Sequence, residues 1–360
     1  MSLWNPQSLI VRIPNWIGDA VMCEPALRDL RDQVPLAHLA ILARPAIGQL
    51  FQGHPAIDEI VEYDWRGIHR GMLGLGALMR GLRSKKFEMA VLFQNAFEAA
   101  FIAWGAGIST RVGYPTDGRR AFLTQAISLR GSEFRHQTEY YRKIVAEAFS
   151  CQLGNRLPSL VIRPEEEIQA ATKFPDVFDD SAGMLVGINP GSVYGSAKRW
   201  LPERFAEVVN KLVRDLKDLD PENREPRCVI VGGMGEESLG RTIAARLSCE
   251  TSLLSGRTTI REMLSVLKRC AIFLTNDTGP MHVAQALGVP VVAIFGSTDP
   301  DSTGPVDQAH GVVRSSVRCA PCFLRTCPID HRCMTGVTVE QVVDAARAQL
   351  AHRSVVSKTS

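Results

Sequence analysis

Short apolar runs alternate with longer amphipathic segments along the whole chain. In the first half, strand-like runs lie at residues 9–14, 37–43, 59–63, 89–94, 111–114 and 126–129, and helical patterns lie at 19–33 and 135–149. In the second half, the strand-like runs are 185–189, 228–231, 251–254, 272–275 and 291–295, and the helical patterns are 202–218, 236–247, 260–268, 281–287 and 339–350. This alternation predicts an α/β protein with parallel sheets covered by helices on both faces.

The alternation stops once, around the loop-like sequence FPDVFDDSAG, and we expect two domains on either side of that stop. The expected organisation is an N-terminal Rossmann-like domain at 1–165, a linker with a helical turn or two at 166–182, a C-terminal Rossmann-like domain at 183–352 and a flexible tail at 353–360. The two sheets are expected to face a central cleft. In such sheets ligands bind beyond the carboxyl ends of the strands.

Composition narrows the class of protein. Of 360 residues, 45% are hydrophobic and 22% are charged, as in a globular protein, and no apolar run is long enough to span a bilayer. The first residues lack the basic segment and apolar core of an export signal, so we expect a cytoplasmic protein. No basic stripe is interleaved with aromatic residues, so no nucleic-acid partner is expected.

Charge is spread unevenly along the chain. Residues 1–164 contain 19 Lys and Arg against 14 Asp and Glu, whereas the rest contain 22 against 24. This bias suits an acidic partner such as a phosphorylated lipid headgroup, and ordinary surface variation explains it equally well. Residues 66–86 hold six basic residues and no acidic one. That segment fits either an anionic membrane surface or a partly buried helix with a solvated basic face.

The loop after the first strand, PNWIGD, carries the first candidate residues. Asp19 lies at the start of a helix, where it either caps the backbone amides or takes a proton from an acceptor hydroxyl. Trp16 packs locally or stacks on a sugar. Asn15, Trp16 and Gly18 are therefore candidates for the acceptor side of a site.

The loop GSVYGSAKRW, residues 191–200, follows the first strand of the second half. Its small residues allow backbone amides to approach a phosphate, and Ser192 and Ser196 add hydroxyl donors. Lys198 supplies a positive charge. The spacing is not that of a Walker A loop. An ordinary Gly/Ser loop is the alternative interpretation.

A third loop, TNDTGPMH at residues 275–282, gives the strongest signal. A strand ends at Asn-Asp, and a helix begins near Gly279 with a proline in its favoured early position. The first-turn amides of such a helix favour an anion such as a diphosphate. Asp277, Thr278, Gly279 and His282 are candidates for donor binding, although Asp277 can equally cap the helix and His282 can be structural.

Two further features carry weaker signals. The sequence GGMG at 232–235 lacks the spacing of a dinucleotide fingerprint, so NAD binding is poorly supported and no cofactor is expected. Glu236, which follows it, suits a ribose hydroxyl or a helix start. Four cysteines lie close together in sequence, and structural metal binding, redox or disulfide chemistry, and packed reduced thiols all remain open for them: Cys319, Cys322, Cys327 and Cys333.

Taken in order, the segments NWIGDAVM, GSVYGSAKRWLPERFAE, TNDTGPMHVAQALGVPVVAIFGSTDPDSTGP and CAPCFLRTCPIDHRCM give a resemblance over nearly the whole chain. The chain resembles the bacterial lipopolysaccharide heptosyltransferases, glycosyltransferase family 9. The resemblance implies a GT-B fold, an inverting mechanism without a catalytic metal, ADP-heptose as donor and a lipid-linked core sugar as acceptor. It also implies peripheral contact with the cytoplasmic face of the inner membrane.

The resemblance assigns roles to the candidate residues. It implies that Asp19 is the general base and that Lys198 stabilises the departing ADP with the amides around Thr278 and Gly279. The other implied donor contacts come from the remaining polar candidates in the second half: Ser192, Ser196, Glu236, Asp277 and His282. Alternatives remain open, namely a sister enzyme acting on Kdo or another core heptose, and a non-catalytic nucleotide-sugar binding module.

Overall fold

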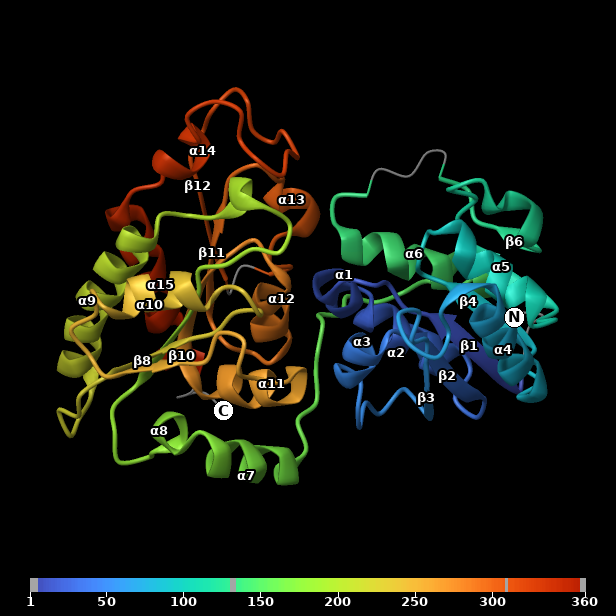
Figure 1. Cartoon of the computed structure of the whole chain (residues 1–360), viewed down its shortest axis with the longest axis horizontal. Helices are drawn as coiled ribbons and strands as arrows, with labels where there is room; N and C mark the ends of the chain where they lie inside the picture. Colours follow the sequence, from blue (N-terminus) through green and yellow to red (C-terminus); the bar gives the residue numbers. More distant parts are fainter. Residues whose placement is uncertain (1–5, 130–133, 308–309, 357–360) are drawn as a thin grey trace. The chain divides into compact units, whose positions relative to one another are not determined.

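The computed structural model describes residues 6–129, 134–307 and 310–356, and the chain divides into two compact units, Met1–Val161 and Ile162–Ser360. Within the described residues, each unit contains a six-stranded parallel sheet (Figure 1). The strand orders are β3-β2-β1-β4-β5-β6 and β12-β11-β10-β7-β8-β9. Counted from the first strand of each unit, the two orders are the same, and they are those of a doubly wound α/β fold. The predicted fold class is confirmed.

In the first unit the strands are β1 Ser8–Arg12, β2 His38–Ala43, β3 Glu59–Glu62, β4 Met89–Leu92, β5 Thr110–Gly113 and β6 Gln125–Ala126. The helices are α1 Ile17–Met22, α2 Glu24–Gln33, α3 Pro45–Gln49, α4 Gly71–Ser84, α5 Phe97–Gly105, η1 Arg119–Phe122 and α6 Gln137–Phe149. Leu78 and Leu82 of α4 and Ala103 of α5 pack in one core cluster with side chains of β1, β2 and β4. Burial of this apolar face stabilises the unit.

In the second unit the strands are β7 Leu185–Asn189, β8 Arg227–Ile230, β9 Thr251–Leu253, β10 Cys270–Asn276, β11 Val291–Phe295 and β12 Gly311–Arg314. The helices are α7 Pro164–Lys173, α8 Pro175–Phe178, η2 Ser196–Lys198, α9 Pro202–Leu219, α10 Glu237–Ala244, α11 Ile260–Arg269, α12 Gly279–Ala286, α13 Pro300–Thr303, α14 Arg332–Thr335 and α15 Val339–Val356. Apolar residues of α9, α10 and α15 share one core cluster with the sheet, and α11 and α12 lie on its other side (Figure 1).

Several elements differ from the sequence prediction. The helix expected at 19–33 is two helices, because Pro25 has no N–H with which to continue the hydrogen bonds of α1. β6 covers Gln125–Ala126 rather than 126–129, and β12 was not expected. Residues 166–182 hold most of α7 and all of α8, and Glu166 and Lys173 form ion pairs with α11. α15 continues to Val356, and the rest of the expected tail, 357–360, lies outside the described residues.

Candidate functional site

The carboxyl ends of β7 and β10 are neighbours at the centre of the second sheet, where the strand order reverses. Ligands of doubly wound sheets bind at this point. Two buried asparagines connect the loops that follow these strands. Asn189 Nδ2 donates to Thr278 Oγ1 at 3.3 Å, and Asn276 Nδ2 donates to the Pro190 carbonyl at 2.8 Å. The loops at 190–198 and 277–279 are thereby held against each other.

Lys198 and Asp277 form an ion pair at this edge. Lys198 ends η2, and its Nζ lies 2.5 Å from Asp277 Oδ2. Thr298, which follows β11, donates its hydroxyl to the same oxygen at 2.6 Å. Asp277 is only 4% exposed, so water screens the pair weakly. An ammonium group has three N–H donors, and the interaction with Asp277 uses one of them, so the pair can still receive an anionic ligand.

Trp200 fixes the backbone next to Lys198. It is 2% exposed, its N–H donates to Asn276 Oδ1 at 3.0 Å, and its Nε1 donates to the Val337 carbonyl at 3.2 Å. Its ring meets Phe205 edge to face, with 5.1 Å between the centroids. Because the backbone N–H and the indole N–H of this buried residue are both satisfied, Trp200 has little freedom, and the backbone that leads to Lys198 is held in place.

The N-terminus of α12 lies at the same edge. Its N-cap, Thr278, has an extended backbone and makes no side-chain capping hydrogen bond. Pro280 has no N–H and the Met281 N–H donates to the Thr278 carbonyl at 3.1 Å, so the Gly279 N–H and the helix dipole are what this end offers to an anion. Thr278 and Gly279 are half-buried, whereas His282 is 3% exposed inside the helix's first turns. Of these candidates, Thr278 and Gly279 are the ones that solvent reaches.

Glu236 lies against the loop that follows β7. Its Oε2 accepts from the Gly233 N–H at 2.8 Å, and a Cβ on Gly191 would come within 2.1 Å of its carboxyl carbon. A side chain at position 191 would therefore displace the Glu236 carboxylate from this position. Ser192 is buried, and its hydroxyl has no hydrogen-bond partner among the described residues, whereas Ser196 is exposed on η2. The structure thus brings every donor-side candidate to one edge of the second sheet.

In the first unit the β1–α1 segment carries Asn15, Trp16, Gly18 and Asp19 together. The Tyr141 hydroxyl of α6 donates to Asp19 Oδ1 at 3.2 Å. Burial, and after it the negative charge of Asp19, raises the pKa of Tyr141 well above its ordinary value. Tyr141 therefore stays protonated and orients the carboxylate. Trp16 is 58% exposed and presents its ring to solvent.

Sequence reasoning missed two buried arginines at this edge of the first sheet. Arg12 donates to Asn15 Oδ1 at 2.9 Å, and Arg119 donates to Asn95 Oδ1 at 3.1 Å. Burial lowers the pKa of each guanidinium to about 10, so both remain cations at neutral pH. The signal for Arg12 was a lone charged residue closing the apolar run LIVR. No comparable signal marked Arg119, which lies on a 3-10 turn.

The cysteine-rich segment, residues 319–333, contacts the loop that carries Lys198. The Arg325 carbonyl accepts from the Ala197 N–H at 3.0 Å, and the Tyr194 hydroxyl donates to the Phe323 carbonyl at 2.6 Å. A Cβ on Gly195 would come within 2.1 Å of the Arg325 carbonyl oxygen, so glycine permits this close approach. The segment thus supports the Lys198 loop, a role that its spacing did not predict.

The thiols of this segment are free. Burial, followed by the nearby thiols of Cys319, Cys322 and Cys327, raises the pKa of Cys333. Over residues 6–129, 134–307 and 310–356, no three His, Cys, Asp or Glu side chains are grouped so as to hold a metal ion. The high pKa favours a protonated, unreactive thiol at Cys333.

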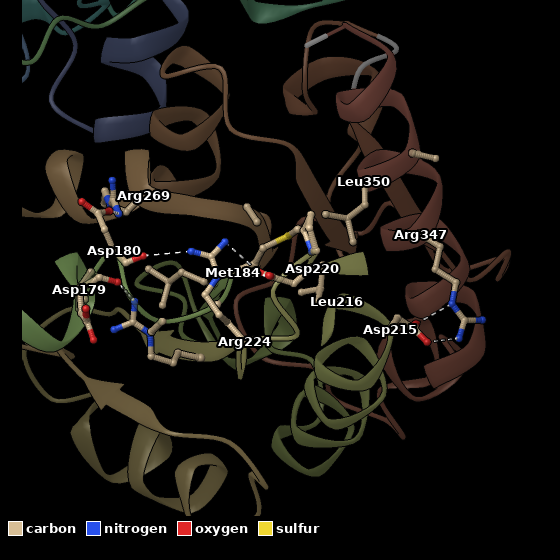
Figure 2. A pocket seen from close by; sticks show the side chains of 18 residues that line it. Asp179, Asp180, Met184, Asp215, Leu216, Asp220, Arg224, Arg269, Arg347 and Leu350 are labelled. Carbon is tan, nitrogen blue, oxygen red and sulfur yellow. Dashed lines mark hydrogen bonds and ion pairs between the residues drawn. The ribbon is translucent and has the colours of Figure 1, made fainter. Parts of the chain in front are cut away.

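A cavity of about 720 Å³ lies at the other end of the second sheet (Figure 2). Met184, Leu216 and Leu350 give it apolar walls, close to where β7 begins. Its charged residues neutralise one another: Arg347 pairs with Asp215 at 2.8 Å, and further pairs join Arg224 to Asp220 and Arg269 to Asp180. Because ligands of such sheets bind at the carboxyl ends of the strands, this cavity is not the candidate site.

Among the described residues, no helix has the length and apolarity needed to cross a membrane.

The chain is similar to known proteins of one family. Residues 75–332 match the family model described as glycosyltransferase family 9 (heptosyltransferase). The chain is 27% identical to lipopolysaccharide heptosyltransferase 2 of Salmonella typhimurium over 316 residues, which cover 85% of this chain and 87% of that protein. The structure of ADP-heptose LPS heptosyltransferase II from E. coli superimposes with a TM-score of 0.79 at 24% identity, covering 96% of this chain and 99% of that one. A family 9 glycosyltransferase from Veillonella parvula gives 0.85 at 23% identity, covering 96% and 98%.

Proposed function

This chain belongs to glycosyltransferase family 9, the heptosyltransferases, and is therefore an enzyme; from that premise we propose that it transfers L-glycero-D-manno-heptose from ADP-heptose to the first heptose of the lipopolysaccharide inner core. Relatives named lipopolysaccharide heptosyltransferase 2, which match 85% of the chain, support this acceptor. The observation that carries the proposal is the ion pair of Lys198 and Asp277 beside the uncapped N-terminus of α12. Such an arrangement suits a diphosphate leaving group.

The donor is proposed to bind at the carboxyl edge of the second sheet. Lys198 and the first amides of α12 neutralise the diphosphate as it departs, and Asp277 keeps the ammonium aimed at it. Glu236 accepts a hydrogen bond from a ribose hydroxyl, and Ser192 and Ser196 donate to phosphate oxygens. His282 is nearly fully buried on α12, so we expect a smaller contribution to donor binding from it than from Lys198.

Asp19 is proposed as the general base, with Asn15, Trp16 and Gly18 on the acceptor side. The acceptor hydroxyl gives its proton to the Asp19 carboxylate while its oxygen attacks the anomeric carbon of the donor. The bond from that carbon to the ADP oxygen breaks, ADP takes the bonding electrons, and the configuration inverts. Tyr141 donates to Asp19 Oδ1 and holds the carboxylate in the orientation that accepts the proton.

The proposed partners follow from this reaction. They are ADP-heptose and a lipid-linked core acceptor, with no cofactor and no nucleic acid. Because the acceptor is anchored in lipid, we propose that the enzyme works in the cytoplasm at the inner membrane surface. The basic bias of residues 1–164 supports an acceptor that carries phosphate.

Mass spectrometry of reactions with ADP-heptose and one of two acceptors tests the proposal. One acceptor is Kdo-lipid A, and the other is the same lipid already bearing one heptose. Gain of one heptose on the second acceptor alone is the expected result. Gain on the first alone would reassign the chain to a sister enzyme acting on Kdo. Tight binding of ADP-heptose without gain on either acceptor would favour a nucleotide-sugar binding module.

A further inference from the structure

A group of exposed apolar side chains lies on the first unit, at the turn after β3 and the first turn of α4. The group consists of Trp65, Ile68, Met72 and Leu73, whose exposed fractions are 39, 77, 79 and 90%. Single exposed apolar residues are common, but several large ones close together mark a contact surface. We refer to these four residues as the Trp65–Leu73 surface.

The backbone that carries this surface is held in place before any partner arrives. Asp64 Oδ1 accepts from the Gly67 N–H at 2.9 Å, and His69 Nδ1 accepts from the Asp64 N–H at 3.1 Å. Gly74, buried on α4, touches this turn, because a Cβ there would lie 2.4 Å from the His69 carbonyl carbon. The turn is therefore seated on α4, and its apolar side chains point outward from a fixed support.

Arginines lie beside the Trp65–Leu73 surface. The guanidinium carbons of Arg44 and Arg66 both lie 4.8 Å from the centre of the Trp65 ring. Arg70, the N-cap of α4, and Arg80, farther along the helix, are exposed. From residue 65 to residue 80 the chain holds three arginines and no acidic residue. An interfacial tryptophan, protruding aliphatic side chains and flanking arginines are what an anionic bilayer surface binds.

The same surface lies at the edge of the sheet that carries Asp19. β1 and β3 belong to one parallel sheet, so the turns after both strands emerge at the same edge. The Arg12 guanidinium lies 5.4 Å from the centre of the Tyr63 ring and also donates to Asn15 in the β1–α1 segment. Arg12 therefore links the turn of the Trp65–Leu73 surface to the segment of the proposed base.

We propose that the Trp65–Leu73 surface docks on an anionic lipid bilayer, with the apolar side chains inserted among the acyl chains and the arginines paired with lipid phosphates. This binding needs neither donor nor acceptor sugar, so it goes beyond the proposed transfer reaction. Its consequence for that reaction rests on the proposed function. Docking would place the acceptor side of the first unit next to the headgroups from which a lipid-linked acceptor projects.

Co-sedimentation of the full chain with sugar-free vesicles tests the docking directly. We expect binding to vesicles containing phosphatidylglycerol and at least about tenfold weaker binding to phosphatidylcholine alone, because several arginines contribute at an anionic surface. Met72→Glu/Leu73→Glu should lower binding to the anionic vesicles by about tenfold or more. The matched control is Leu36→Glu, since Leu36 is 94% exposed but precedes β2 at the opposite edge of the same sheet.

Both variants change exposed side chains, and equal melting temperatures would verify that they fold. Failure of the unaltered chain to bind anionic vesicles would overturn the proposal, as would equal binding to both vesicle types. Equal losses in the Leu36 variant and the double variant would overturn the assignment to this surface.

Transfer assays separate docking from catalysis. With a water-soluble acceptor that carries the core sugars but no acyl chains, the double variant should keep the turnover of the unaltered enzyme. With the acceptor embedded in anionic vesicles, it should be about tenfold slower at low enzyme concentration. Equal rates on vesicles would overturn the consequence for acceptor delivery. Absence of transfer by the unaltered enzyme to either acceptor would refute the proposed function and leave the vesicle-binding result standing.

Discussion

The two units share a strand order but differ at the edges where their ligands are proposed to bind. In the second unit, side chains from three loops meet in one hydrogen-bonded set, with Lys198 and Thr298 both on Asp277 and a further segment supporting the Lys198 loop. In the first unit, Asp19 has the Tyr141 hydroxyl as a partner, and Trp16 beside it is 58% exposed. The proposed donor-side residues are joined to one another, whereas Trp16 on the proposed acceptor side is exposed.

This difference matches what each edge is proposed to bind. A diphosphate has the same charge and shape in every turnover, so a rigid set of cations and amides can be prepared for it in advance. An acceptor sugar on a lipid offers hydroxyl groups, which need one well-placed base and adaptable contacts around it. The comparison therefore predicts that changes in the second unit alter donor binding and changes in the first alter chemistry or acceptor use.

The largest effect is expected from Asp19→Asn, which removes the proposed base while keeping its shape. Turnover should fall by roughly 10²–10⁴-fold, because general base catalysis contributes about that much. The affinity for ADP should be unchanged, since the nucleotide is proposed to bind the other unit. Steady-state kinetics and calorimetric titration with ADP measure the two quantities. Near-normal turnover would remove Asp19 as the base.

The next largest effect is expected from Lys198→Met, which should lower turnover by about 10²–10³-fold and should also lower the affinity for ADP. The variant also leaves the buried Asp277 carboxylate without its cation, which destabilises the second unit. Lys198→Met/Asp277→Asn should recover thermal stability without recovering turnover. Recovery of both would show that the ion pair is structural and that Lys198 does not act on the diphosphate.

The third prediction concerns whether the stability of the second unit depends on ion pairs outside the proposed donor site. Burial raises the pKa of Glu166, but hydrogen bonds from Arg261 and Arg163 outweigh it and lower that pKa to about 2 from an ordinary value of 4.5. The stability this carboxylate contributes is therefore full above about pH 4.5 and is lost as the pH falls toward 2. A pKa shift of this size corresponds to about 3.4 kcal/mol, and because solvent screens the half-exposed Arg163 partner, we estimate a contribution of about 2 kcal/mol to the free energy of unfolding.

Glu166→Gln should remove that contribution at neutral pH and flatten the acid dependence of unfolding in this window. Urea titrations at about pH 6 and about pH 3 measure it. Transfer kinetics at neutral pH should be nearly unchanged, because neither Glu166 nor its partner Arg261 is among the residues proposed to bind the donor. If the free energy of unfolding of the variant fell as steeply with decreasing pH as that of the unaltered chain, other carboxylates would dominate acid unfolding.

The sequence predicted the two doubly wound sheets and nearly all of their strands, because buried parallel strands appear as short apolar runs between helical patterns. It also placed the candidate residues at strand ends, and the structure groups Lys198, Asp277 and Thr278 accordingly. This worked because each loop follows directly from a strand whose position is set by its own burial. Local sequence was enough for those residues.

Residues whose role depends on distant segments were missed. Tyr141 reaches Asp19 across 122 positions, and Tyr194 reaches Phe323 across 129. Neither pair has a spacing that marks it, because a contact between separate elements is set by tertiary packing. Arg119, with its guanidinium on backbone carbonyls and Asn95, was missed for the same reason.

The smallest expected effect concerns Tyr194, whose contacts at the carboxyl edge of the second sheet the sequence did not predict. Its ring lies 4.7 Å from Lys198 Nζ and 5.3 Å from the Arg325 guanidinium carbon, and its hydroxyl donates to the Phe323 carbonyl. Tyr194→Leu removes both the ring and the hydrogen bond, and should raise the KM for ADP-heptose about five- to tenfold. Tyr194→Phe keeps the ring, so about a two- to threefold rise is expected from the lost hydrogen bond.

The two Tyr194 variants distinguish the contribution of the ring from that of the hydroxyl. The KM for acceptor distinguishes an effect on the first unit from an effect on the second. If the ring holds Lys198 for the donor, the KM for ADP-heptose must rise more in the leucine variant than in the phenylalanine variant. The KM for acceptor must stay unchanged in both. Equal effects would assign the role to the hydroxyl and the cysteine-rich segment alone. A rise in the acceptor KM would break the comparison, because a change confined to the second unit would then have altered what the first unit is proposed to bind.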